Sequence, residues 1–132
     1  MKRQNLILIG IIILSLIFVG CSGVIPDVNQ KEKIKEVVNN YWLTIANNQY
    51  ELAKNYCVKN GIAYNTVNGY QNLFNAGNLP DIDLIPNINW VCIIGSKSVV
   101  NLDVKSIVSF GDVTTEDLEL SLIKIGNVWK LK

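Results

Sequence analysis

The spacing of hydrophobic residues changes from one part of the chain to the next. After a polar boundary near residue 29, hydrophobic side chains recur every three or four positions, at Ile34, Val37, Val38, Tyr41, Trp42 and Ile45. That spacing places them on one side of an amphipathic helix, and charged residues occupy the other side. A capping-box pattern precedes them, because Asn29 is followed three positions later by Glu32. The pattern predicts a helix from about Gln30 to Asn47.

Two shorter helices are predicted next. One runs from about Gln49 to Lys59 and buries Leu52, Ala53, Tyr56 and Cys57. Gly61 would end it, because glycine adopts the left-handed conformation after a helix without strain. The other lies between Asn68 and Gly77, with Tyr70, Leu73 and Phe74 facing inward. The Asn68-Gly69 pair is equally typical of a turn.

From Pro86 onward the hydrophobic period becomes two, which is typical of strands. The inward positions expected for the first strand are Ile88, Trp90, Cys92 and Ile94. Later strands would point Val100, Leu102 and Val104, then Leu118, Leu120 and Leu122, to the same side, and Val128–Leu131 closes the chain. Helices followed by hairpins predict an α+β fold, with two to three N-terminal helices packed on a curved antiparallel sheet of about four strands. Trp42, Trp90 and Trp129 are expected to close its core together.

The first 20 residues have a different pattern. Residues Leu6 to Gly20 contain no charged side chain, and Lys2 and Arg3 precede them. The run is shorter than the roughly 20 residues that a membrane-spanning helix needs. A basic start and a short apolar centre are typical of a secretory signal peptide. We therefore predict a signal peptide over 1–20, a tether over 21–28 and a folded domain over 29–132.

The end of this segment resembles a bacterial lipobox. The residues are Phe18, Val19, Gly20 and Cys21, with Phe where the motif usually has Leu. The resemblance implies cleavage before Cys21 and a thioether-linked diacylglycerol on its sulfur, which would hold the chain at the extracytoplasmic face of the cell membrane. An uncleaved anchor ending at Cys21 is the alternative. The tether spans at most about 25 Å. The Asn-, Ile- and Lys-rich composition points to a Gram-positive bacterium.

Two stretches of the domain resemble the NTF2-like (cystatin-like) α+β cone. They are "IKEVVNNYWLTIANNQYELAKNYC", residues 34–57, and "LIKIGNVWKLK", residues 122–132. The resemblance implies a long helix with an aromatic stripe, a short helix after it, and a curved sheet that wraps over both. It extends to small Gram-positive lipoproteins of this type. Because the fold carries both enzymes and non-catalytic modules, it does not select a function.

The composition excludes several kinds of chemistry. The chain has 132 residues and a net charge of +1, which becomes about −1 without Lys2 and Arg3, so it lacks the basic character of a nucleic-acid binder. It has no histidine, the commonest general base and metal ligand. No metal site, cofactor motif or nucleophile motif is predicted. Asp103 falls on the polar side of its strand and Asp83 in a connection, so no inward carboxylate is expected either.

Cysteine and aromatic residues provide the remaining candidates. Cys57 and Cys92 could form a disulfide outside the cytoplasm, or both could be small buried residues. The candidates for a pocket or a contact surface are Tyr41, Tyr56, Tyr70, Trp90 and Trp129. Tyr64 could line the same cavity.

These observations favour a membrane-tethered, non-catalytic module that binds a small ligand or a protein partner through its sheet. The alternative is a pocket enzyme of the isomerase or dehydratase type. A homodimer formed through the open sheet face is also left open.

Overall fold

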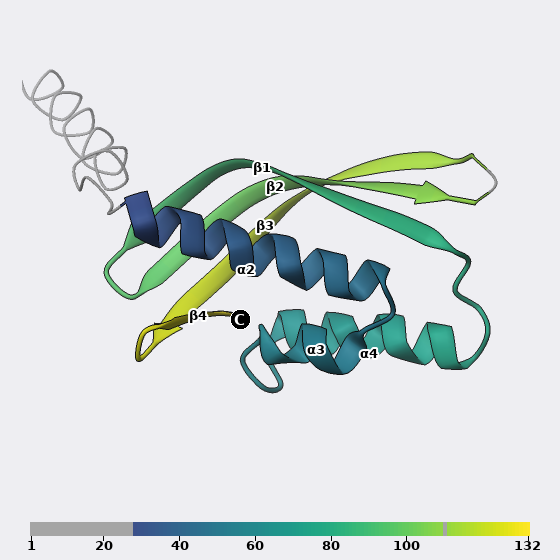
Figure 1. Cartoon of the computed structure of the whole chain (residues 1–132), viewed down its shortest axis with the longest axis horizontal. Helices are drawn as coiled ribbons and strands as arrows, with labels where there is room; N and C mark the ends of the chain where they lie inside the picture. The colour runs from purple at the N-terminus through teal and green to yellow at the C-terminus, as the bar shows by residue number, and fades with distance from the viewer. Residues whose placement is uncertain (1–27, 110) are drawn as a thin grey trace, which may run out of the picture.

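The computed structural model describes residues 28–109 and 111–132 (Figure 1). Three helices come first: α2 (Val28–Ala46), α3 (Tyr50–Asn55) and α4 (Ile62–Asn75). Four strands follow: β1 (Ile82–Ile94), β2 (Lys97–Val108), β3 (Val113–Ile125) and β4 (Val128–Leu131). The predicted α+β fold, with helices before an antiparallel sheet, is confirmed. The predictions of a signal peptide and of lipidation at Cys21 lie outside the described residues.

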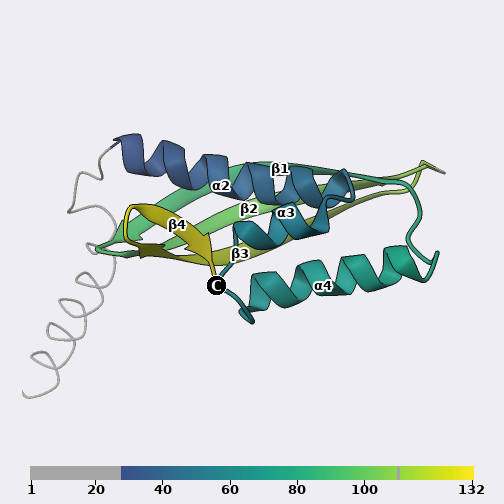
Figure 2. The same cartoon turned by 60° about the horizontal axis from the view of Figure 1, so that its bottom comes forward.

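The four strands form one antiparallel sheet in the order β1-β2-β3-β4. Tight turns join β1 to β2 and β3 to β4, and Gly95 and Gly126 adopt positive φ angles of 60° and 61° in them. The long strands curve, and α2 lies along the inner face of the sheet (Figures 1 and 2). α4 runs below α2, on the same side of the sheet.

The core lies between α2 and the inner face of the sheet. The predicted helix stripe is confirmed, because Ile34, Val38, Tyr41, Trp42 and Ile45 are all buried. The sheet side of the core consists of residues with even numbers on β2 and β3, chiefly Val100, Leu102, Val104 and Leu122. These positions also follow the predicted alternation. Period-two and helical patterns were therefore sufficient to identify most of this core.

A β-bulge changes the predicted alternation in β1. Ile88 pairs with Leu102, and Trp90 pairs with Asn101, so Asn89 is an extra residue between them. An extra residue reverses which side each later residue faces. Val91 and Ile93 consequently pack on the core. The prediction that Trp90, Cys92 and Ile94 face inward is wrong: Trp90 is 46% exposed and Ile94 is 62% exposed.

The two shorter helices also differ from their predictions. α3 ends at Asn55, earlier than expected, and Leu52 is exposed. α4 begins at Ile62 and continues through Gly69, so the alternative of a turn there is wrong. Ala63 and Val67 supply its buried side, whereas Leu73 and Phe74 are exposed. The start at Ile62 was missed because the helix has no polar cap, only Gly61.

Backbone hydrogen bonds join the α3–α4 connection to the end of β4. Val58 N–H donates to the Leu131 carbonyl at 2.6 Å, and Ala63 N–H donates to the Lys132 carbonyl at 3.0 Å. Cys57 forms an isolated parallel bridge with Leu131. The first turn of α4 is therefore held against the last residues of the chain.

The Cys57–Cys92 disulfide that the sequence left open does not form. Cys57 carries a free thiol, which is buried and contacts the Ala53 carbonyl at 3.5 Å. Cys57 lies beside β4, whereas Cys92 lies on β1 at the other edge of the sheet. Strands are about 4.8 Å apart, and a disulfide needs Cα atoms within about 7 Å. With β2 and β3 in between, the two cysteines are too far apart.

Candidate functional site

A cavity of about 440 Å³ lies between α2, α4 and β3, and we call it the main cavity. Its apolar lining consists of Trp42, Ile62, Ala63, Leu118 and Leu120. Its polar lining includes Tyr41, Thr66, Tyr70, Glu116 and Glu119. The volume falls within the 300–1,000 Å³ that is usual for small-molecule sites. Residues from α2, α4 and β3, together with Lys132 after β4, build it, so no single motif encodes it.

The α2 side of the main cavity is formed by Tyr41 and Trp42. The Tyr41 hydroxyl donates to the Ala63 carbonyl at 3.1 Å, which joins α2 to the first turn of α4. Burial raises the pKa of Tyr41, so its phenol stays protonated at neutral pH. The two rings meet edge to face, with their centroids 5.1 Å apart. Tyr41, a pocket candidate from the sequence, therefore both joins α2 to α4 and lines the main cavity.

Trp42 has an unusual feature. Its indole Nε1 is buried and has no hydrogen-bond partner. Among the side chains of residues 28–109 and 111–132, it is the only buried nitrogen or oxygen in this state. Leaving such a donor unpaired costs about 1–3 kcal/mol. Trp42 is only 4% exposed, and it lines the main cavity. A hydrogen-bond acceptor brought into this region would lower that cost.

Tyr70 and Glu116 lie on opposite sides of the main cavity, on α4 and β3. Burial raises the pKa of Tyr70, and the nearby Glu116 carboxylate raises it further. Glu116 pairs with Val104 across the sheet, and even-numbered residues of β2 and β3 face the helices. The expectation of no inward carboxylate is therefore wrong. The sequence does indicate this orientation, because Glu116 lies at an even-numbered position of the strand, as Leu118, Leu120 and Leu122 do.

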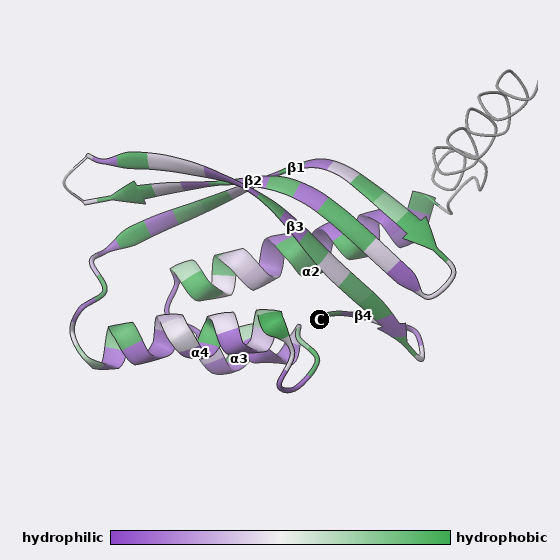
Figure 3. Cartoon of the chain, turned by 180° about the vertical axis from the view of Figure 1, so that it is seen from behind, coloured by the Kyte–Doolittle hydropathy of each residue, from purple (hydrophilic) through white to green (hydrophobic). Residues whose placement is uncertain are grey.

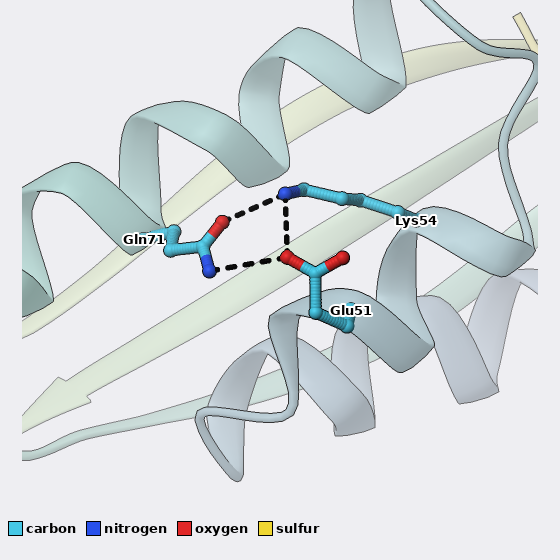
Figure 4. A network of polar contacts seen from close by, with 3 residues as sticks. All are labelled: Glu51, Lys54 and Gln71. Carbon is cyan, nitrogen blue, oxygen red and sulfur yellow. Dashed lines mark hydrogen bonds and ion pairs between the residues drawn. The ribbon is translucent and has the colours of Figure 1, made fainter.

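A polar network holds α4 against α3 (Figure 4). The Lys54 ammonium donates to Glu51 Oε1 at 2.8 Å and to Gln71 Oε1 at 2.7 Å, and Gln71 Nε2 donates to Glu51 Oε1 at 3.2 Å. Lys54 also lies over the Tyr64 ring, 5.6 Å from its centroid. Hydrogen bonds from Lys54 and Gln71, together with the Lys54 charge, lower the pKa of Glu51. The network positions the α4 wall of the main cavity.

Tyr56 and Trp129 lie elsewhere, beside a smaller hollow of about 220 Å³. Trp129 is 2% exposed, and its indole N–H donates to Gln30 Oε1 at 2.8 Å. The suggestion that Trp129 forms an exposed contact surface is therefore wrong, since β4 and the start of α2 cover it. Trp90 is the exposed tryptophan, and it lies on the outer face of the sheet.

The two aspartates weighed from the sequence do not reach the main cavity. Asp103 lies on the outer face of β2 and accepts a hydrogen bond from Asn89 at 3.3 Å. Asp83 is exposed in β1, opposite Ile107, because that strand begins earlier than predicted. Within the described ranges, no three side chains of His, Cys, Asp or Glu are grouped to hold a metal ion. The same ranges contain no helix long and apolar enough to cross a membrane.

Comparisons with known proteins identify the fold. The sequence matches no protein-family model and no curated protein. Among solved structures, the chain is similar to a variant of the designed NTF2-like protein Rd1NTF2_05, with a TM-score of 0.55 and 10% identity. The match covers 76% of this chain and 94% of that one. The domain therefore has the NTF2-like cone architecture that its sequence resembles. At this identity the likeness shows the fold alone.

Proposed function

We propose that this protein is a lipid-tethered extracytoplasmic module whose main cavity binds a small, largely apolar molecule without transforming it. The main cavity is the observation that carries the proposal. Its volume of about 440 Å³ suits a small ligand, and its walls combine aromatic and aliphatic side chains with a few polar groups. A planar or aliphatic body would pack between Trp42 and Leu120.

The polar groups restrict the kind of ligand further. Glu116 and Glu119 line the main cavity, against one cation, Lys132. This balance disfavours an anionic ligand. The Tyr41 and Thr66 hydroxyls donate to the Ala63 and Ile62 carbonyls, so they can accept from a ligand, whereas the Tyr70 hydroxyl can donate or accept. The expected ligand is therefore neutral or cationic, and it carries at least one hydrogen-bond acceptor.

A titration with the neutral fluorescent probe N-phenyl-1-naphthylamine tests this proposal. We expect its fluorescence to rise on entering the cavity, and we expect saturation at one probe per chain. Thr66→Phe should reduce binding, because Thr66 is exposed and lines the main cavity, so a larger side chain fills the space without disturbing the core. Asn72→Phe is the matched control, since Asn72 is also exposed on α4 but does not line the cavity.

Two outcomes would contradict the binding proposal. One is no saturable binding of the neutral probe. The other is an equal loss of binding in the Thr66→Phe and Asn72→Phe variants, which would place the probe elsewhere. The anionic analogue 1-anilinonaphthalene-8-sulfonate should bind more weakly than the neutral probe, and Glu116→Gln should narrow that difference.

The tether is tested separately, by growing cells with a radioactive fatty acid. We expect label on the full chain and none on a Cys21→Ser variant. Equal labelling of both chains would contradict the anchor while leaving the binding proposal intact.

Glu116 favours one second candidate function, a cone-pocket enzyme of the isomerase or dehydratase type. A carboxylate across a partly apolar cavity from the Tyr70 phenol has the components for proton transfer. Deuterium exchange next to the carbonyl of cyclic ketones, followed by NMR in D₂O, would reveal it. Exchange catalysed by the natural chain but not by Glu116→Gln would favour the enzyme over the binding module.

A further inference from the structure

We propose that one end of the domain docks onto the membrane that holds its anchor. The docking surface consists of the tips of two hairpins, and its members are Ile94, Lys97, Ile125 and Val128. We call it the hairpin-end surface. The proposal rests on the anchor at Cys21 that is proposed above. It goes beyond tethering, since it assigns an orientation to the domain and a lipid contact to named residues.

The two hairpin tips lie together. Ile94 pairs with Lys97 in the first hairpin, and Ile125 pairs with Val128 in the second. Lys124 N–H donates to the Ser96 carbonyl at 2.7 Å, which joins the two turns directly. Ile94, Ile125 and Val128 all point to the outer face of the sheet, opposite the helices. They therefore form one continuous end surface rather than three separate residues.

These apolar side chains are exposed where turns usually carry polar residues. Ile94 is 62% exposed, Ile125 is 55% and Val128 is 51%. One exposed isoleucine is ordinary, but a group of them at one end marks a contact surface. Seen from behind, β1 ends in hydrophobic residues at the end of the sheet where α2 begins (Figure 3).

The start of α2 lies at this same end. The indole N–H of Trp129, which directly follows Val128, donates to Gln30 Oε1 at 2.8 Å. From Cys21 to Val28 the chain can span at most about 25 Å. β3 has 13 residues, so its far end lies about 40 Å from the hairpin-end surface. An anchor at Cys21 would thus bring this end, and not the far one, to the lipid headgroups.

Charge makes the membrane the favoured occupant. Lys97 belongs to the hairpin-end surface, and Lys31, Lys33 and Lys35 lie on the first turns of α2 nearby. Lys124 lies on the helix-facing side of the same end, over the Trp129 ring, 6.0 Å from its centroid. Among the described residues, the acidic side chains at this end are those of Glu32, which pairs with Lys35 at 3.0 Å, and Glu36. Other acidic residues lie near the opposite end of the sheet, where β1 and β3 begin, namely Asp81, Asp83, Asp112 and Glu116. Exposed apolar residues with lysines around them are suited to an anionic bilayer surface.

Photocrosslinking tests this orientation in the full chain. The protein is produced in cells, purified from membranes, confirmed by mass to carry diacylglycerol on Cys21, and reconstituted into phosphatidylcholine vesicles containing phosphatidylglycerol. A diazirine amino acid replaces Ile94, Ile125 or Val113, one at a time. Val113 is the matched control, because it is a 52% exposed β-branched residue at the far end of the same sheet.

We expect crosslinks to lipid from positions 94 and 125, and few from position 113. Each lysine near an anionic surface contributes about 1 kcal/mol, or about fivefold. A Lys97→Ser variant should therefore lower the ratio of docked to undocked chains about fivefold. Vesicles without phosphatidylglycerol should give a larger loss, because they also remove the attraction to Lys31, Lys33 and Lys35.

Three results would overturn the docking proposal. Equal lipid crosslinking from positions 94 and 113 in an anchored chain would mean that the domain has no preferred orientation. Crosslinks from position 94 to a second copy of the chain, and not to lipid, would assign this surface to a dimer. A purified chain without lipid on Cys21 would remove the anchor itself, and the mass measurement separates that failure from the other two.

Discussion

Gly61 and Gly69 provide a paired test of how α4 is placed. Both glycines belong to the same region, and the same substitution to alanine should change stability in opposite directions. Gly61 is the N-cap of α4, and Gly69 lies in the middle of the helix. The contrast depends on tertiary contacts, because both substitutions reduce the flexibility of the unfolded chain equally.

At Gly61 an added Cβ would lie 2.8 Å from the carbonyl carbon of Lys132 and 3.1 Å from the Val58 carbonyl oxygen. Both are backbone atoms, so neither can move aside cheaply. Overpacking of this kind costs about 1–3 kcal/mol, and alanine is also a poorer N-cap than glycine. Alanine also lowers the conformational entropy of the unfolded chain, which offsets about 0.4–1 kcal/mol of this loss. We expect Gly61→Ala to lower the free energy of unfolding by about 1–2 kcal/mol.

At Gly69 an added Cβ would meet nothing within 4 Å. The residue is exposed, and alanine in a helix interior is about 0.5–1 kcal/mol more favourable than glycine. We expect Gly69→Ala to raise the free energy of unfolding by that amount. The free energies of unfolding of the two variants should therefore differ by about 1.5–3 kcal/mol.

Urea unfolding of a chain of residues 28–132, followed by circular dichroism, measures both changes. The denaturant dependence should stay constant while the midpoints move apart. If Gly61→Ala is as stable as the natural chain, the close approach of α4 to the end of β4 is refuted. If Gly69→Ala is destabilising, α4 does not pass through residue 69 as a helix.

Three further predictions follow from individual residues. Burial raises the pKa of the Cys57 thiol to about 12, so iodoacetamide at pH 8 should modify it only after denaturation. Peptide mass mapping measures this, and rapid modification of the folded chain would contradict the burial of Cys57. The lowered pKa of Glu51 stabilises the fold above the ordinary glutamate pKa of about 4.3, and this contribution is lost as pH falls through the lower pKa of the folded state. The stability difference between the natural chain and Glu51→Gln should therefore shrink on acidification, and a difference that stays constant would argue against the Lys54 contact. Trp90→Thr should change the free energy of unfolding by no more than about 0.5 kcal/mol, whereas Leu102→Ala should lower it by about 2–5 kcal/mol. A large loss of stability in Trp90→Thr would refute the bulge at Asn89.

The candidate site shows how far sequence reasoning extends. Tyr41 and Tyr70 were named as pocket candidates, and both line the main cavity. Glu116 was not predicted to face inward, although it shares the even-numbered positions of Leu118, Leu120 and Leu122, because most acidic residues of this strand, Asp117 and Glu119, occupy odd positions. Trp42 was assigned to the core only. Its unpaired N–H could not be predicted, since a hydrogen-bond partner depends on which segments meet around the ring.

Some features of this protein were determined by the sequence alone. The stripe from Ile34 to Ile45 and the alternation from Val100 to Leu122 encode a helix and two strands, because each periodicity places apolar groups on one side of its own element. Those elements, in that order, already indicate an α+β cone. The local hydrophobic pattern is sufficient to predict a helix or strand, and the side that it buries, wherever the element has a single buried side.

Other features were decided only by tertiary structure. Three such features are the bulge at Asn89, the start of α4 at Ile62 and the separation of Cys57 from Cys92, and all depend on contacts between distant segments. A bulge reverses every later residue of a strand, yet it leaves little trace in the hydrophobic pattern of β1, where both sides carry apolar residues. The main cavity depends on the meeting of α2, α4, β3 and Lys132, and its existence follows from their packing rather than from any one stretch of sequence.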